Sequence, residues 1–133
     1  MVTIYINQQN SSSRKAIAWL EEHGIEFHVR NVARSRLSKQ ELREILAITV
    51  NGTEEILSMR GDYSKKLDLD TMTLNELLDE LLAEPSLMKT PLIIENRNLL
   101  AGFNVEEIRK FLPRKWRALD YARLKNENKL FIA

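Results

Sequence analysis

The sequence predicts an α/β fold in which a mixed sheet flanked by helices is interrupted by an all-helical insertion. Three observations support this prediction. The chain opens with a strand–helix–strand pattern over residues 2–29, capped amphipathic helices fill residues 36–88, and a hairpin followed by a helix covers residues 90–112. We therefore expect one sheet-containing core made of residues 1–35 and 89–133, with residues 36–88 as the helical insertion.

The first unit is a strand, a helix and a second strand. Apolar and polar residues alternate over residues 2–6, which is the pattern of a half-buried strand. The serines at 11–13 offer hydroxyl acceptors to the first N–H groups of the following helix. Gly24 is typical of a helix end, and alternation returns over residues 25–29. Because such crossovers are right-handed and join neighbouring strands, we expect the two strands to be parallel.

The insertion begins with a capping box formed by Ser38 and Glu41, in which each side chain hydrogen-bonds the backbone of the other residue. The apolar residues that follow have helical spacing and form an inward face of Leu42, Ile45 and Leu46. Gly52 is expected to end this helix, and a short helix is expected to start at Thr53.

The second half of the insertion repeats the same signals. A helical turn is expected over residues 63–67, and a second capping box at Thr73 and Glu76 opens a leucine-rich helix. Pro85 ends this helix, because proline disfavours the helical conformation in the residue before it. The inward face is expected to hold Leu77, Leu78, Leu81 and Leu82.

The chain after the insertion returns to strands. Residues 92–94 and 99–101 are apolar runs joined by a polar turn, which predicts a β-hairpin. Asn104 is expected to cap a helix that ends at Pro113, and a last basic helix is expected over 114–125. The first of these helices would carry Val105, Ile108, Phe111 and Leu112.

The composition excludes several kinds of chemistry. The chain has no cysteine, which rules out disulfides, thiolate metal sites and thiol catalysis, and His23 and His28 alone cannot form a zinc site. We therefore expect a non-enzyme without catalytic, cofactor-binding or metal-binding residues. No apolar run approaches the ~20 residues of a membrane span, so we expect a cytoplasmic monomer without a signal peptide or membrane contact.

Charge is unevenly distributed although the formal net charge is only +1. Residues 37–84 carry five Lys or Arg against eleven Asp or Glu, a balance of −6, and residues 106–133 carry eight against four, a balance of +4. Segregated charge of this kind favours steering toward a partner. Two independent solvated faces are the alternative explanation.

The polar loop after the first strand, "NQQNSSSRKA" at residues 7–16, has the shape of a thioredoxin-type active-site turn without its sulfur atoms. Asn10 and Ser13 stand where a C-x-x-C pair would be. An inactive enzyme and a scaffold with another use both remain open. An anion bound by helix N–H groups, Arg14 and Arg60 is a further alternative, with solvated arginines as the simpler explanation.

Four segments carry a resemblance to a known family. They are "RKAIAWLEEHGIEF", "NGTEEILSMRG", "TPLIIE" and "GFNVEEIRKFLPRK", at residues 14–27, 51–61, 90–95 and 102–115. Together with the element order, they resemble the Spx family of RNA-polymerase-binding regulators, on the arsenate-reductase-like branch of the thioredoxin superfamily. The resemblance runs from residue 1 to about 117. It implies a thioredoxin-like core with a cis proline at Pro91.

The resemblance implies a regulator of stress-related transcription that binds the C-terminal domain of the polymerase α subunit. Gly52 would lie at this contact, where a glycine lets two backbones approach closely. Asn51 and Thr53 would flank it, with Arg43 as a nearby polar partner because Ala47 stands where relatives often have arginine.

The same resemblance implies further partners. Promoter DNA would be met only within the polymerase complex. The expected DNA contacts are Arg114, Lys115 and Arg117. They lie in a basic stretch that is also typical of a solvated helix face. The apolar end "LFIA" would deliver the protein to the ClpXP protease.

The missing cysteines are the main departure from the family. A thiolate is the nucleophile in disulfide exchange, so asparagine and serine cannot operate the family's redox switch and the protein should be redox-insensitive. Whether the cysteines were lost naturally or by deliberate mutation is open, as is activation versus interference. The alternative function is a catalytically inactive arsenate-reductase-like or glutaredoxin-like protein that serves as a binding module.

Overall fold

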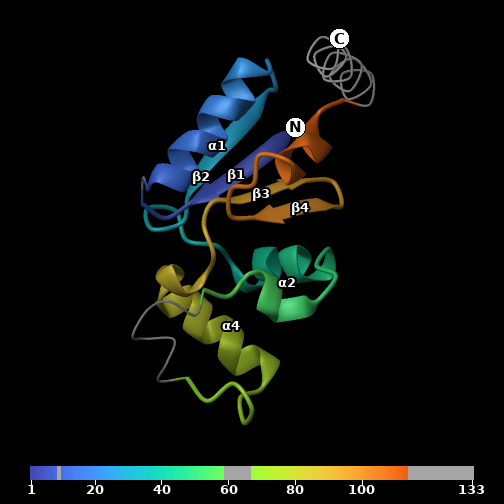
Figure 1. The fold of residues 1–133 in the computed structure, drawn as a ribbon. Coiled ribbons are helices and arrows are strands. Elements are labelled where there is room, and N and C mark those ends of the chain that lie inside the picture. Colours follow the sequence, from blue (N-terminus) through green and yellow to red (C-terminus); the bar gives the residue numbers. More distant parts are fainter. Residues whose placement is uncertain (9, 59–66, 114–133) are drawn as a thin grey trace, which may run out of the picture.

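The structure, a computed structural model, describes residues 1–8, 10–58 and 67–113 (Figure 1). Its centre is a mixed four-stranded sheet in the order β2–β1–β3–β4. The strands are β1 (Val2–Ile6), β2 (Phe27–Asn31), β3 (Leu92–Glu95) and β4 (Asn98–Ala101). β1 and β2 are parallel, and the other two pairs are antiparallel. The predicted α/β class, the parallel first unit and the hairpin are confirmed.

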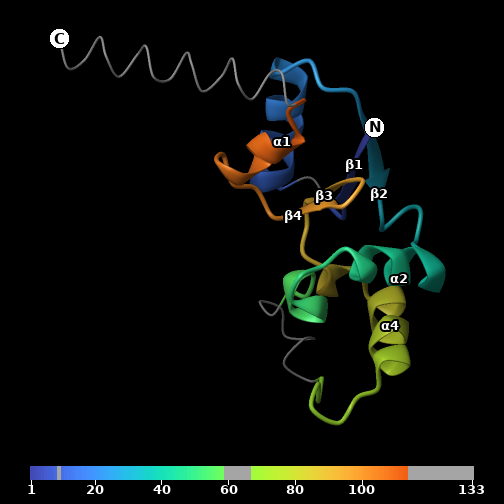
Figure 2. The same cartoon turned by 90° about the vertical axis from the view of Figure 1, so that its right-hand side faces the viewer.

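One face of the sheet is covered by α1 (Ser11–Glu22) and the short 3-10 helix η3 (Glu107–Phe111), which lie on the same side in Figure 2. Leu20 of α1 packs in one cluster with Ile4 and Ile93, and all three side chains are fully buried. Removing apolar side chains of this size from water contributes about 1.5–3 kcal/mol each. This cluster fixes α1, and with it the turn that precedes α1, on the sheet.

Part of the opposite face of the sheet, on β1, β3 and β4, packs against the insertion, which lies below the sheet in Figures 1 and 2. Its elements are α2 (Lys39–Ala47), η1 (Gly52–Glu55), α4 (Leu74–Ala83) and η2 (Pro85–Leu87). The buried residues of these helices form one cluster with Leu92 of β3, and Tyr5 of β1 packs against it. Successive strand residues point to opposite faces, so β1 and β3 contribute to both clusters.

The part of the chain described between β2 and β3 contains no regular strand. Its one strand-like pairing is an isolated antiparallel bridge between Leu57 and Met88. The boundaries of the insertion at residues 36 and 88 stay a prediction, because the insertion and the sheet share a core cluster.

Both predicted capping pairs lie at helix starts, but the full capping box forms only at α2. The Ser38 hydroxyl accepts a hydrogen bond from the Glu41 N–H, and the Glu41 carboxylate accepts one from the Ser38 N–H, both at 3.1 Å. At α4 the Thr73 hydroxyl accepts from the Glu76 N–H at 3.2 Å, whereas the Glu76 carboxylate accepts from the Thr73 hydroxyl, at 3.1 Å, and not from the Thr73 N–H. Each cap satisfies an N–H group that a helix start otherwise leaves unpaired.

The end of α2 differs from the prediction. The helix stops at Ala47, five residues before Gly52, and Gly52 instead begins η1. Thr49 accounts for the difference, because its N–H and its hydroxyl both donate to the Leu46 carbonyl, at 3.1 and 2.7 Å. This local turn replaces the next helical hydrogen bonds.

The predicted helix after the hairpin is shorter than expected. The Asn104 side chain accepts hydrogen bonds from the N–H groups of Glu106 and Glu107, as a cap should, but η3 is a 3-10 helix that starts only at Glu107. Val105 was expected on the apolar face and is instead 61% exposed, because it lies in the capping turn. Ile108 is buried as predicted.

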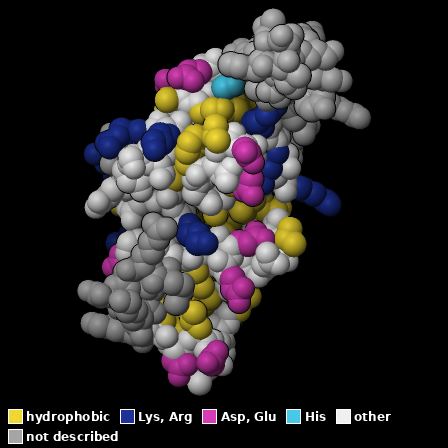
Figure 3. Space-filling view, viewed as in Figure 1, with side chains coloured by type: hydrophobic (Ala, Val, Ile, Leu, Met, Phe, Trp, Pro, Cys, Tyr) yellow, Lys and Arg dark blue, Asp and Glu magenta, His cyan; other side chains and the backbone are white. Residues whose placement is uncertain are grey.

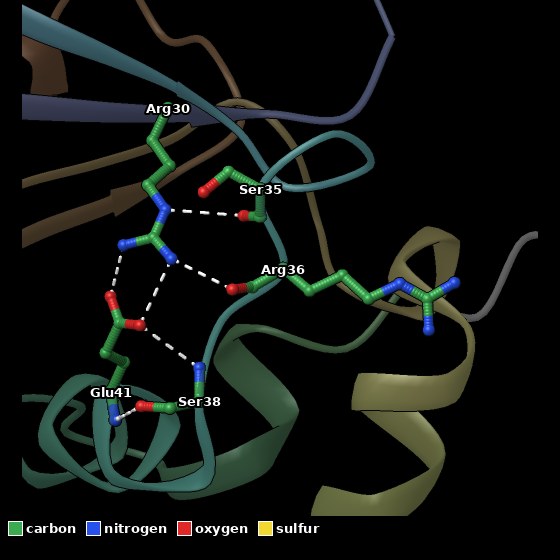
Figure 4. Close-up of polar contacts among 5 residues, drawn as sticks. All are labelled: Arg30, Ser35, Arg36, Ser38 and Glu41. Atoms are coloured by element: carbon green, nitrogen blue, oxygen red, sulfur yellow. Dashed lines mark hydrogen bonds and ion pairs between the residues drawn. The ribbon is translucent and has the colours of Figure 1, made fainter.

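Arg30 joins the sheet to the insertion (Figure 4). Its guanidinium forms a two-pronged ion pair with Glu41 of α2 and donates to the carbonyl of Arg36 at 2.9 Å. The Arg30 hydrogen bond is the leading cause that lowers the pKa of Glu41 below its ordinary value of 4.5. Burial, with the nearby Glu41 charge, raises the pKa of Tyr5 above its ordinary 10.0. Two-pronged Arg–carboxylate pairs fix orientation as well as distance.

Among the described residues, no helix is long and apolar enough to span a membrane. The helical turn predicted over residues 63–67 lies almost wholly outside the described residues, and so does the basic helix predicted over 114–125.

Candidate partner-binding site

The turn before α1 is organised by Asn10. Its side-chain oxygen accepts a hydrogen bond from the Ser13 N–H at 2.8 Å, and its carbonyl accepts one from the Arg14 N–H at 3.1 Å. The first N–H groups of α1 are thus capped by Asn10 rather than by the expected serine hydroxyls. Ser13 is fully buried, and its hydroxyl has no hydrogen-bond partner in the described structure.

An open groove of about 870 Å³ runs beside this turn. Asn10 and Ser12 line it on the sheet side, and residues of the insertion and of the loop after β4 line it opposite. The Thr90–Pro91 bond, which is cis as the resemblance implies, lies at the start of β3. Of the described residues that line the groove, only Glu54 and Lys89 carry charge.

The anion alternative stays a prediction, because Arg60 lies outside the described residues. Arg14 is exposed on α1 and does not line the groove. Of the two N–H groups that the alternative uses, those of Ser12 and Ser13, the Ser13 N–H is already bonded to Asn10. In the ranges that the structure describes, no three His, Asp or Glu side chains converge as metal ligands would.

The contact expected at Gly52 lies in a loop on the insertion, residues 48–55, which we call the Gly52 loop. Gly52 has a φ of +75°, and a Cβ atom built on it would meet no atom within 4 Å. Asn51 is exposed and Thr53 is half-buried on either side. The space over this backbone is therefore open to another chain.

Glu55 holds the Gly52 loop in place. Its carboxylate oxygen Oε1 accepts hydrogen bonds from the backbone N–H groups of Val50, at 2.9 Å, and Asn51, at 2.8 Å. The Val50 side chain is 89% exposed. Neither residue was singled out from the sequence; the available signal was an apolar residue between Thr49 and Asn51, outside any helical or strand period.

Arg43 is engaged elsewhere. Its guanidinium donates to the side-chain oxygen of Asn75 on α4 at 3.1 Å. The structure thus brings Asn51, Gly52 and Thr53 together in one loop and joins Arg43 to the neighbouring helix. The expected DNA contacts Arg114, Lys115 and Arg117, and the C-terminal "LFIA", lie outside the described residues.

A second groove, of about 540 Å³, separates the Gly52 loop from the hairpin and η3. Lys89 and Ala101 line both grooves, so the two adjoin. Figure 3 shows that the visible charged side chains of the insertion half are mostly acidic, whereas Lys and Arg gather mainly over the sheet half. The Gly52 loop and the turn at Asn10 therefore face adjoining hollows of one surface.

Comparison with known proteins identifies relatives over most of the chain. The ArsC family profile matches residues 5–111. The "Global transcriptional regulator Spx" of Streptococcus mutans is 43% identical over 88% of this chain and 87% of its own. The proteins of the same name from Listeria innocua and Enterococcus faecalis are each 44% identical, over 88% and 90% of this chain and 91% and 92% of their own.

Solved structures agree in fold. An arsenate reductase from Vibrio cholerae superposes with a TM-score of 0.75 at 24% identity, over 84% of this chain and 97% of its own. An arsenate reductase related protein from Brucella melitensis gives 0.62 at 27% identity, over 82% and 92%. The mixed sheet and its helices are thus those of a thioredoxin-like ArsC fold, and the chain belongs to the ArsC family and, within it, to the Spx group, as a member without cysteine.

Proposed function

We propose that the protein is a transcription regulator that acts by binding the C-terminal domain of the RNA polymerase α subunit. Relatives at 43–44% identity that carry the name of global transcriptional regulators support the regulatory role. The observation that supports the contact is the Gly52 loop, with its positive φ and open space above Gly52. A partner's backbone or ring can lie directly on that glycine.

Binding through an ordered surface loop suits a regulator without chemistry of its own. The loop is held by Glu55 before any partner arrives, so little conformational entropy is lost on association. In this proposal Asn51 and Thr53 flank the contact and Arg43 supports it through α4. Promoter DNA is met only within the polymerase complex, and degradation by ClpXP removes the regulator.

The decisive experiment is a calorimetric titration with the isolated C-terminal domain of the polymerase α subunit. Gly52→Arg puts a long charged side chain into the open space and should cost at least ~2 kcal/mol of binding free energy, as loss of an interface hot spot does. Gly24→Arg is the matched control, because Gly24 also has a positive φ, +64°, and open space around its Cβ position.

Both arginine variants should lose roughly 1–2 kcal/mol of folding stability, because a non-glycine residue is strained in the left-handed conformation. Only the Gly52 variant should lose affinity. Equal binding by wild type and Gly52→Arg would contradict the assigned contact, and absence of wild-type binding would contradict the proposed partner.

A second candidate function is that of an inactive arsenate-reductase-like module holding a small molecule. The groove of about 870 Å³ beside the turn favours it. Titration with phosphate and with arsenate, followed through the amide NMR signals of Asn10 and Ser12, tests this candidate. Saturable shifts at these two residues would support it, and unchanged spectra would remove it.

A further inference from the structure

Val50 is exposed to an unusual degree for an apolar residue in an ordered loop. Its side chain is 89% exposed, more than any other large hydrophobic side chain in the described ranges; the next is Met1 at 76%. Single exposed apolar residues are ordinary on protein surfaces. What distinguishes Val50 is the way in which its backbone is held.

Three hydrogen bonds and a turn fix the backbone around Val50. One carboxylate oxygen of Glu55 accepts hydrogen bonds from the Val50 N–H, at 2.9 Å, and from the Asn51 N–H, at 2.8 Å. On the other side, the Thr49 hydroxyl donates to the Leu46 carbonyl at 2.7 Å. The β-branched side chain adds stiffness at χ1. The isopropyl group is therefore presented to solvent by a pre-ordered loop.

We infer that Val50 is the apolar anchor of the Gly52 contact, inserting its isopropyl group into a small apolar pocket on the polymerase α C-terminal domain. This inference rests on the proposed function and names the residue that supplies its binding energy. Val50 is continuous with the proposed contact, since Asn51 follows it directly. It also lines the second groove, where Ile48 and Leu99 extend the apolar surface.

Glu55 is the positioning residue in this arrangement. Both N–H groups are bonded to the same oxygen, so the charge of the carboxylate is not needed to hold them. A glutamine retains one side-chain carbonyl oxygen of the same reach, whereas alanine retains none. We therefore expect Glu55→Ala to disorder the loop that the partner binds, and Glu55→Gln to keep that loop ordered.

Val50→Thr is the sharpest test, because threonine keeps the shape of valine and replaces one methyl group with a hydroxyl. A hydroxyl buried without a partner should weaken binding of the α C-terminal domain at least about fivefold. Val29→Thr is the matched control. Val29 is also exposed, at 38%, but lies on β2, the sheet edge opposite β4 and the second groove.

The positioning role of Glu55 is tested in the same binding assay. Glu55→Ala should weaken binding severalfold, and Glu55→Gln should restore most of the affinity. Adding Val50→Thr to Glu55→Ala should then cost less than Val50→Thr does alone, because contacting residues that act as one unit are not additive. Additive losses, or a Gln variant as weak as the Ala variant, would overturn the positioning role.

The outcomes separate the anchor from the proposed function. If Val50→Thr binds like wild type while Gly52→Arg does not, the anchor is wrong and the proposed function stands. If wild type does not bind the domain, both fall. An equal loss in Val29→Thr would also overturn the anchor. So would wild-type self-association in sedimentation that Val50→Thr abolishes, because the occupant would then be a second copy.

Discussion

Asn10 and Ser13 lie at the two ends of one short turn and contribute to it in opposite ways. Asn10 supplies the acceptor that caps α1, at 2.8 Å from the Ser13 nitrogen. Ser13 contributes its backbone N–H, while its hydroxyl is buried without a partner in the described structure. The turn in which the resemblance implies two sulfur atoms is thus capped here by one amide oxygen.

The two residues should therefore respond differently to truncation. Asn10→Ala removes the cap and should lower the free energy of unfolding by ~0.5–2 kcal/mol. Ser13→Ala removes an unsatisfied buried hydroxyl and should leave stability unchanged or raise it slightly. Urea unfolding of both variants measures this. A Ser13 variant as destabilised as the Asn10 variant would show that the hydroxyl is bonded after all.

A second consequence of the residues in this turn is that partner binding should not respond to redox conditions. With no thiol in the chain, affinity for the α C-terminal domain should be the same in strong reductant and in diamide. The control is the double variant Asn10→Cys/Ser13→Cys, in which a C-x-x-C pair should form a disulfide on mild oxidation, as thiol titration would show. A change above about threefold in wild type, traced to this chain, contradicts redox indifference.

At the scale of an element, the joint between β2 and α2 is made by the ion pair of Arg30 with Glu41. The Arg30 hydrogen bond lowers the pKa of Glu41, so the folded state favours the carboxylate more strongly than the unfolded chain does. This contribution is present above the unfolded-state pKa, near 4.5, and is lost as pH falls through the lower folded-state value.

Glu41→Gln should accordingly be less stable than wild type at pH 7, and the difference should shrink as pH falls below about 4.5. Thermal unfolding between pH 7 and 3 measures it. Glu26→Gln is the control, since Glu26 is exposed just before β2 and lies outside the joint. A gap between wild type and Glu41→Gln that stays constant with pH would exclude the ion pair as its cause.

The elements predicted well are those specified over three or four residues. Ser38 with Glu41 and Thr73 with Glu76 open helices because the capping partners are adjacent in sequence. The predicted end of α2 was wrong because a glycine is a stronger signal for a helix end in the sequence than a threonine. In the structure the hydroxyl of Thr49 bonds to the Leu46 carbonyl where the helix ends. The Arg43–Asn75 contact spans 32 residues, and no local pattern predicts it.

At the scale of the whole molecule, the mixed sheet, its parallel first pair and its hairpin followed from strand patterning and the handedness of the first unit. The strand order β2–β1–β3–β4 and the layer that the insertion covers came only from the structure. Tyr5 and Leu92 alternate with buried neighbours, and the alternation alone does not say which layer covers them. The Gly52 loop was located by resemblance. The exposure of Val50 and its hydrogen bond to Glu55 could be found only in the folded structure, because a carboxylate five residues away gives no periodic signal in the sequence.

The cluster shared by Leu92 and the insertion links the proposed contact surface to the sheet. β1 sends Ile4 into one cluster and Tyr5 toward the other, so the two helical layers share the strand that lies between them. Loosening the buried cluster beneath the Gly52 loop would therefore disturb the packing of β1 and β3 as well, and should cost more free energy than opening the exposed loop alone. A substitution in that cluster should thus weaken both the sheet and the support of the proposed contact.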